Sequence, residues 1–130
     1  MTYLYTAVFS TGEDGTVYAS IPDLPGCITT GKDIQDAIDM ISDAASGWLV
    51  VAEDEGLDIA PPTPQRNVPH EAGDSLSLIR VDTIQYRAQT DTRAVRKNVS
   101  LPAWMANLAD QRGINCSQLL QESLRARLNI

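Results

Sequence analysis

The run RKNVSLPAW, residues 96–104, is basic and lies in a chain whose net charge is −7. Arg96, Asn98 and Ser100 occupy alternate positions in it, so they would share one side of a β-strand. All three side chains offer hydrogen-bond donors, and a cationic segment attracts polyanions. The chemistry predicted for this run is therefore the binding of an anionic partner.

The charges of the chain are divided unevenly between its two parts. Residues 1–84 hold 14 Asp and Glu against 3 Lys and Arg, whereas residues 85–130 hold 3 against 7. An acidic module joined to a basic one favours a cationic protein as partner of the first and a polyanion as partner of the second. A two-part protein with ordinary surfaces is the alternative that charge alone leaves open.

Residues that could support catalysis lack the neighbours they would need. His70 lies in a proline-rich stretch without an evident nucleophile, and Cys27 and Cys116 are far apart with no CxxC spacing. Asp14 and Asp23 would serve a metal-dependent nuclease only if they converged on divalent ions, and no spacing requires this. The sequence predicts a protein that is not an enzyme, with no catalytic residue, cofactor or metal site.

The composition is that of a globular protein, with 43% hydrophobic residues among 130. The N-terminus lacks the basic start and the cleavage site of a signal peptide. No apolar run approaches the roughly 20 residues that a membrane helix needs. We therefore expect a cytoplasmic protein.

The first module shows the patterns of an α+β layer. Asp33 is placed to cap a helix in which apolar residues recur at three and four positions, and Gly56 is placed to end it. Proline and glycine breakers over residues 57–75 predict a surface loop. The predicted strands are residues 3–10, 16–21, 27–30 and 75–82.

The polar stretch 85–93 has no periodicity and lies where the charge changes sign. We expect it to be a linker between domains 1–84 and 94–130. The second domain reads as a strand in 94–101, a helix that starts near Pro102 and ends near Gly113, and a second helix with leucines at intervals of four.

One short strand and two amphipathic helices cannot bury their own apolar faces. Two copies can, if their strands pair as an antiparallel ribbon above four helices. This pattern resembles the ribbon-helix-helix family of bacterial DNA-binding domains over residues 94–128. The resemblance implies a homodimer whose ribbon enters the major groove of DNA, where Arg96, Asn98 and Ser100 read base edges.

The same resemblance implies contacts to DNA phosphates. Lys97 would reach a phosphate from the inner side of the strand, and the start of the second helix would bind another at Asn115, Cys116 and Ser117. A solvated strand face in a module that only dimerises is the alternative.

Residues 12–38, GEDGTVYASIPDLPGCITTGKDIQDAI, resemble the HicB antitoxin family through an acidic hairpin turn, the PDLPG loop, Gly31 and Ala37. The resemblance covers about residues 3–82 and implies a partial RNase-H-like β-β-β-α-β domain. It also implies a partner, a small basic mRNA nuclease of the HicA family. The candidate toxin contacts are Glu13, Asp14 and Asp23, for which turn formation is the alternative role.

The sequence thus predicts an antitoxin that neutralises a HicA-type toxin through residues 1–84. It also predicts that a dimer formed through residues 94–130 binds operator DNA and represses its own promoter. Whether the N-terminal domains also pair, making a tetramer, stays open. The alternatives are a free-standing ribbon-helix-helix repressor with a ligand-sensing N-terminal domain and a metal-dependent nuclease.

Overall fold

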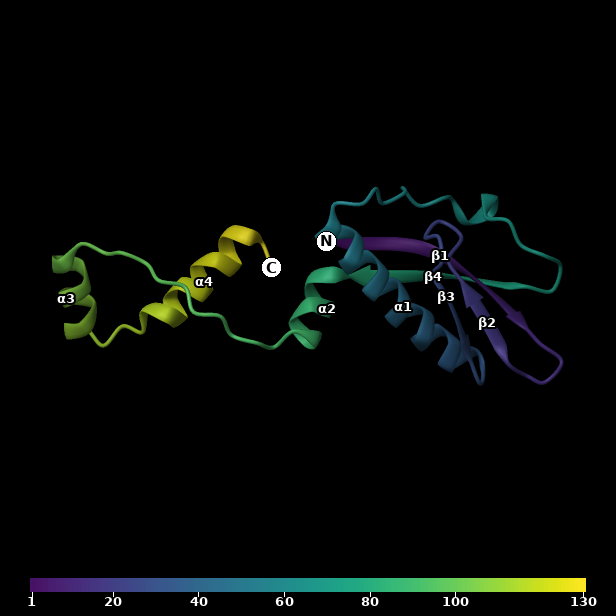
Figure 1. Ribbon diagram of the computed structural model, residues 1–130, viewed down its shortest axis with the longest axis horizontal. Coiled ribbons are helices and arrows are strands. Elements are labelled where there is room, and N and C mark those ends of the chain that lie inside the picture. Colours follow the sequence, from purple (N-terminus) through teal and green to yellow (C-terminus); the bar gives the residue numbers. More distant parts are fainter. The chain divides into compact units, whose positions relative to one another are not determined.

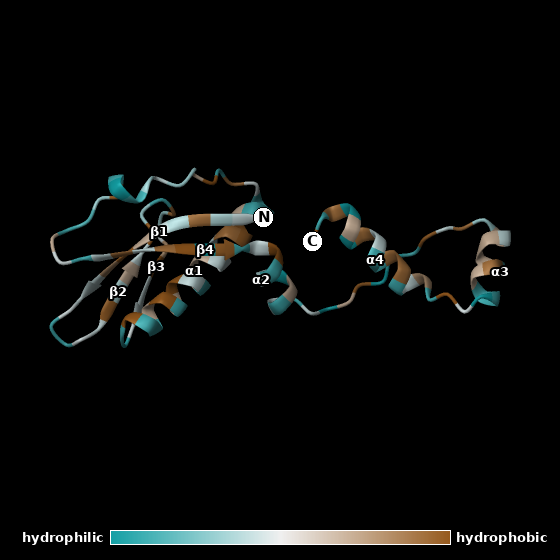
Figure 2. Ribbon diagram, turned by 180° about the vertical axis from the view of Figure 1, so that it is seen from behind, coloured by the Kyte–Doolittle hydropathy of each residue, from teal (hydrophilic) through white to brown (hydrophobic).

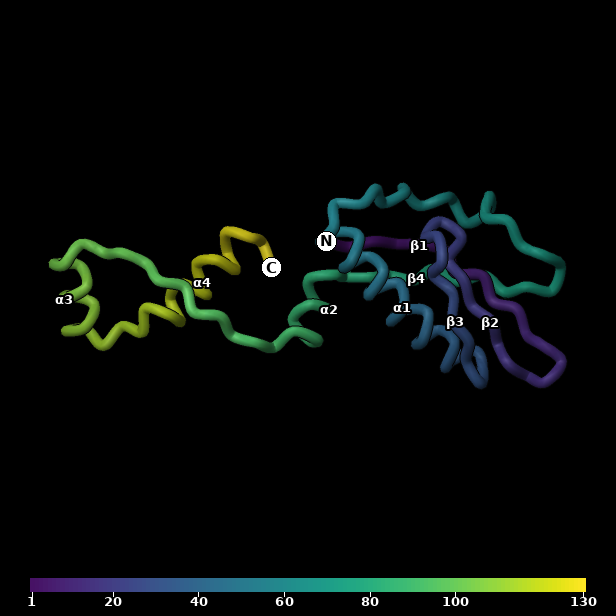
Figure 3. Tube along the Cα trace, viewed as in Figure 1, coloured from purple at the N-terminus to yellow at the C-terminus, as the bar shows by residue number.

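The computed structural model describes residues 1–130 and divides them into two compact units, Met1–Thr92 and Arg93–Ile130. We call these unit 1 and unit 2. Figure 1 shows a sheet with a long helix in unit 1, and Figure 3 follows the same chain as a trace.

Unit 1 contains one antiparallel sheet in the order β3-β2-β1-β4. All four predicted strands are confirmed. The RNase-H-like description of this sheet stays a prediction. The strands are β1 (Thr2–Thr11), β2 (Val17–Ser20), β3 (Ile28–Gly31) and β4 (Ser75–Asp82).

One face of the sheet is covered by α1 (Ile34–Glu55). The predicted caps are confirmed, because the Asp33 carboxylate accepts a hydrogen bond from the Asp36 amide at 2.8 Å and Gly56 ends the helix in a left-handed conformation. Figure 2 shows apolar stretches along α1 and β4. The core joins Tyr5, Ala7, Phe9, Val17, Ala19, Ile79 and Val81 of the strands to Ala37, Ile41, Ala45 and Leu49 of the helix.

The first turn of α1 lies directly against the end of β3. A Cβ atom added to Gly31 would stand 2.6 Å from the Ala37 Cα. No side chain tolerates that approach to a backbone atom, so glycine is required where the helix meets the sheet.

The loop between α1 and β4 is fixed by two contacts. The Asp23 carboxylate accepts hydrogen bonds from the Thr63 amide at 2.7 Å and from its hydroxyl at 2.6 Å, and the Tyr5 hydroxyl donates to the Ala60 carbonyl. The loop contains a short 3₁₀ helix, η1 (Gln65–Asn67), and buries Val68.

The stretch expected to be a linker is instead mostly helical. Helix α2 (Thr83–Thr90) follows β4 directly, and unit 1 extends to Thr92. Arg87 of α2 forms ion pairs with Glu53 at 3.1 Å and Asp54 at 2.9 Å, both near the end of α1. The sequence did not predict this helix because tertiary contacts hold it, and its residues show no apolar periodicity. The domain bounds 1–84 and 94–130 stay a prediction.

Glu53 connects three elements of unit 1. Its carboxylate accepts hydrogen bonds from the Tyr3 hydroxyl at 2.7 Å, the Thr83 hydroxyl at 3.0 Å and the Arg87 guanidinium at 3.1 Å. Burial opposes ionisation of this carboxylate, but the hydrogen bonds outweigh it and lower the pKa of Glu53. Burial and the neighbouring carboxylate raise the pKa of Tyr3 to about 12.

Unit 2 contains the two predicted helices, α3 (Ala103–Gln111) and α4 (Cys116–Leu128). Gly113 has a φ of 64° between them, and the Asn115 side chain caps α4 by accepting from the Gln118 amide at 3.1 Å. Residues 91–102 form neither helix nor strand. A strand needs hydrogen bonds to a second strand, so the predicted strand in 94–101 stays a prediction about the paired protein.

Gly31→Ala tests the contact between β3 and α1. We expect it to lower the free energy of unfolding of unit 1 by roughly 3 kcal/mol, the upper end of the range for overpacking. Urea unfolding followed by circular dichroism measures this. Gly47→Ala is the matched control, because a Cβ there meets only the Tyr86 hydroxyl, at 3.8 Å. An equal loss in both variants would contradict the steric argument.

Glu53→Gln tests the carboxylate that joins α1 to α2. A folded pKa below the ordinary value of 4.5 stabilises the fold at neutral pH, and this stabilisation is lost as the pH falls through the folded pKa. We expect the substitution to cost on the order of 1 kcal/mol at pH 7, since Arg87 is partly exposed, and almost nothing at pH 3. Glu55→Gln, at the same helix end, should change little at either pH. A loss of unfolding free energy in Glu53→Gln that does not change with pH would refute this account.

Candidate binding surfaces

Unit 2 has no buried residue, although it carries many large apolar side chains. A groove of about 480 Å³ runs between the 97–101 segment, α3 and α4. The exposed fractions of its large apolar side chains range from 37% for Leu120 to 58% for Val99. The apolar residues that line it are Val99, Leu101, Met105, Leu108, Ala109, Ile114, Leu119 and Leu120.

The polar residues of the basic run separate from this groove. Lys97 contributes to its lining together with Val99, whereas Arg96, Asn98 and Ser100 do not line it and are exposed. This is the division that alternation along a strand predicts. The predicted roles of these residues in reading DNA bases stay predictions.

The predicted phosphate contacts at the second helix lie at the start of α4. Asn115 is its N-cap, with its side-chain oxygen occupied by the Gln118 amide. Cys116 and Ser117 line the apolar groove. Of these residues and Lys97, only Lys97 carries a charge, and phosphate binding by them stays a prediction.

The three candidate toxin contacts are not brought together by the fold. Glu13 and Asp14 lie in the β1–β2 turn and Asp23 lies beyond the other end of β2. Hydrogen bonds from the Thr16 amide and hydroxyl, each 3.0 Å long, lower the pKa of Asp14. Asp14 fixes the β1–β2 turn, which is its alternative role, whereas Asp23 accepts hydrogen bonds from Thr63 in the distant α1–β4 loop. Glu13 is exposed.

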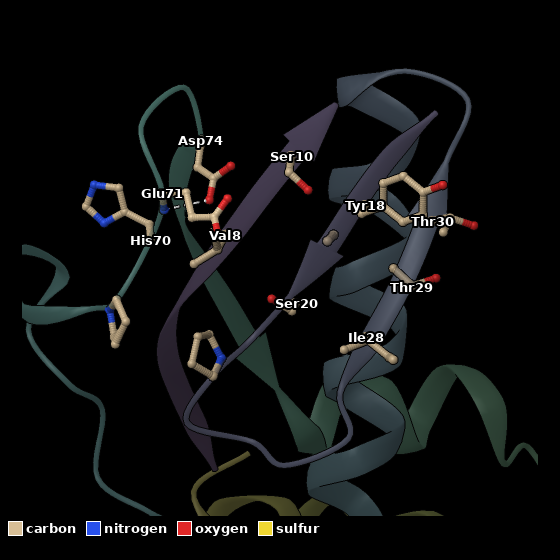
Figure 4. Close-up of a pocket in the computed structure, with 13 residues that line it drawn as sticks. Val8, Ser10, Tyr18, Ser20, Ile28, Thr29, Thr30, His70, Glu71 and Asp74 are labelled. Carbon is tan, nitrogen blue, oxygen red and sulfur yellow. Dashed lines mark hydrogen bonds between the residues drawn. The ribbon is translucent and has the colours of Figure 1, made fainter. Parts of the chain in front are cut away.

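The sheet face opposite α1 carries a groove of about 870 Å³, which Figure 4 shows in close-up. Val8, Tyr18 and Ile28 give it an apolar floor, and the loop with His70 and Asp74 forms one side. His70 Nδ1 lies 2.9 Å from the Val68 carbonyl. In the sequence, this face corresponds to the positions of the strands that alternate with the core positions, and no role had been predicted for them.

A second groove of unit 1, of about 640 Å³, lies along α1 and α2. Gly47 and Val51 of α1, Pro25 of the PDLPG loop and Tyr86 of α2 line it, and the Trp48 indole donates to the Pro25 carbonyl at 2.9 Å. Sequence reasoning missed this surface because it had not predicted α2.

Neither unit holds a recognisable metal site, since no three His, Cys, Asp or Glu side chains gather in a geometry that could ligate an ion. Cys27 is buried and its burial raises the pKa of its thiol, whereas Cys116 is exposed. None of the helices combines the length and the apolar composition that spanning a bilayer needs.

The chain combines an acidic α+β unit with a second unit that has no buried core of its own. Residues 5–122 match the family described as HicB-like antitoxins of bacterial toxin-antitoxin systems, and the chain belongs to this family. The predicted resemblance to HicB antitoxins is thus confirmed.

Solved structures share this fold. A chain of a toxin-antitoxin complex from Streptococcus pneumoniae is similar over 98% of this chain and 99% of that chain, with a TM-score of 0.61 and 20% identity. The Burkholderia pseudomallei antitoxin HicB is similar over 98% and 97%, with a TM-score of 0.56 and 23% identity.

A chain of a HicA3 and HicB3 toxin-antitoxin complex is similar over 61% of this chain and 98% of that chain, with a TM-score of 0.50 and 19% identity. At these identities the likeness concerns the fold alone. No curated protein sequence matches the chain.

Proposed function

We propose that this antitoxin neutralises a HicA-type mRNA interferase through unit 1. We also propose that a homodimer paired through unit 2 binds operator DNA and represses its own promoter. Both activities are binding events that need no catalytic residue, cofactor or metal, and both targets, messenger RNA nuclease and operator, belong to the cytoplasm.

The toxin-binding part rests on family membership and on charge. Within Met1–Thr92 there are 15 Asp and Glu against 4 Lys and Arg. A surface of this sign attracts a cationic RNA-binding protein and speeds its association. Structures with a similar fold include a chain from a complex of HicA3 and HicB3, which supports a toxin of that type as partner.

The observation that carries the DNA-binding part is the apolar groove of unit 2. Leu119 and Val99 leave half or more of their surface in water, so a single copy of this unit is incomplete. A second copy with the same groove would cover it and supply the missing strand partner for residues 94–101. Arg96 and Asn98, which lie outside the groove, would then face outward together.

Growth rescue tests the neutralising function. Cells expressing the small reading frame adjacent to this gene should stop growing, and co-expression of residues 1–92 should restore growth. The fragment extends to residue 92 because a cut after residue 84 would remove Arg87 and its ion pairs with Glu53 and Asp54. A non-toxic neighbour, or no rescue by a folded fragment, would favour the ligand-sensing repressor instead.

Arg96→Ala and Asn98→Ala test base reading. Each should weaken binding of the full chain to its own promoter DNA by about 1–3 kcal/mol and relax the preference for the specific sequence. Fluorescence anisotropy with promoter and scrambled duplexes measures both effects. Arg125→Ala, an exposed arginine of α4, is the matched control and should retain specificity. Equal weakening on both duplexes would mean that Arg96 and Asn98 contact only the DNA backbone.

A further inference from the structure

We propose that the toxin docks on unit 1 at the groove between α1 and α2, with Gly47 at the point of closest approach. This inference rests on the proposed function and names the surface that performs it. The occupant is a cationic protein surface with an apolar centre, because the lining of the groove is mostly apolar and its single charged residue is Asp43.

The charge of α1 favours a cationic partner. The helix carries six Asp and Glu and no Lys or Arg over its 22 residues. Glu53 and Asp54 are paired with Arg87, but Asp39 and Asp43 are exposed and form no ion pair. Asp43 also lines the groove, so its carboxylate is available to a cation that enters there.

The apolar lining of the groove is open to a partner. Val51 is 50% exposed and Leu57 52%, and Ile28 at the edge of the sheet is 70% exposed. These side chains come from α1, from the residue after its C-cap and from β3, and they border one surface. Apolar residues gathered in this way, with acids beside them, are typical of a protein interface.

Gly47 has no structural role within the chain. It lies in the middle of α1, where glycine is among the least favourable residues, and it has no positive φ that would require glycine. A Cβ would meet only the Tyr86 hydroxyl, at 3.8 Å, an ordinary contact. The missing side chain leaves room at the surface for another backbone to approach α1.

Other occupants fit this groove less well. In a two-fold contact between two copies the same surface meets itself, so the carboxylates of Asp39 and Asp43 would lie against an equally acidic surface. Nucleic acid would be repelled by the same carboxylates. The groove on the opposite sheet face is lined by two acids, Glu71 and Asp74, but Arg80 is exposed on that side of β4, opposite Leu4, so both signs of charge occur on that face.

Two variants of the full chain test the proposal against the purified product of the adjacent reading frame, by isothermal titration calorimetry. Gly47→Ala should raise the melting temperature by roughly 2–8 °C, because alanine favours the helix. It should nevertheless weaken binding by about tenfold, because the methyl group occupies the contact. Val51→Arg should weaken binding by about a hundredfold through like charge with the cationic partner.

Leu78→Arg is the matched control. Leu78 lies on the opposite sheet face and is 50% exposed, as Val51 is. This variant should bind the toxin within about threefold of wild type, a difference well below the hot-spot range. Melting temperatures establish that all three variants fold.

The possible results separate the two levels of the proposal. A wild-type chain that does not bind the neighbouring product would overturn the proposed function itself. If the wild-type chain binds and both Gly47→Ala and Val51→Arg retain its affinity, only the docking site is overturned. Loss of binding in Leu78→Arg alone would assign the toxin to the opposite sheet face.

Discussion

The packing of α1 against one face of the antiparallel sheet is the contact on which unit 1 depends. The alanine and leucine side of the helix is buried in this contact. The contact also requires glycine at residue 31, where the first turn of α1 lies against β3. Because that side of α1 packs on the sheet, the acidic side of the helix faces the solvent. The same helix then anchors α2 through Glu53 and Asp54. Core, acidic surface and groove are therefore consequences of one packing arrangement.

Unit 2 is under the opposite constraint, because it cannot form a core alone. In the proposed homodimer its stability would come from association, so the folded population of residues 93–130 would depend on protein concentration. Under the proposed function this dependence has a regulatory consequence. Operator binding requires a dimer, whereas unit 1 has its own core and can meet a toxin as a monomer. Repression and neutralisation would thus respond differently to the amount of antitoxin.

Local signals were enough to predict most elements of both units. Asp33 and Gly56 bounded α1 correctly, and the predicted strand 75–82 has the same bounds as β4. The sequence did not predict α2, since its position depends on ion pairs between residues more than 30 positions apart. For the same reason the α1–α2 groove was not predicted. Turn residues such as Asp14 and Asp23 were identified, but only the structure shows that Asp23 binds Thr63 in the α1–β4 loop.

The residues assigned to the two proposed activities are close in the sequence near the end of α2. Tyr86 lines the proposed toxin groove, and Arg96, the first proposed base reader, follows ten residues later. Residues 91–102 between the two sites form neither helix nor strand, and in the proposed homodimer residues 94–101 would gain a strand partner from the second copy. A toxin bound to α2 would limit the conformations that this segment can take before it pairs with a second copy. Because binding free energies are linked, any effect of toxin on operator affinity must be matched by an equal effect of operator on toxin affinity.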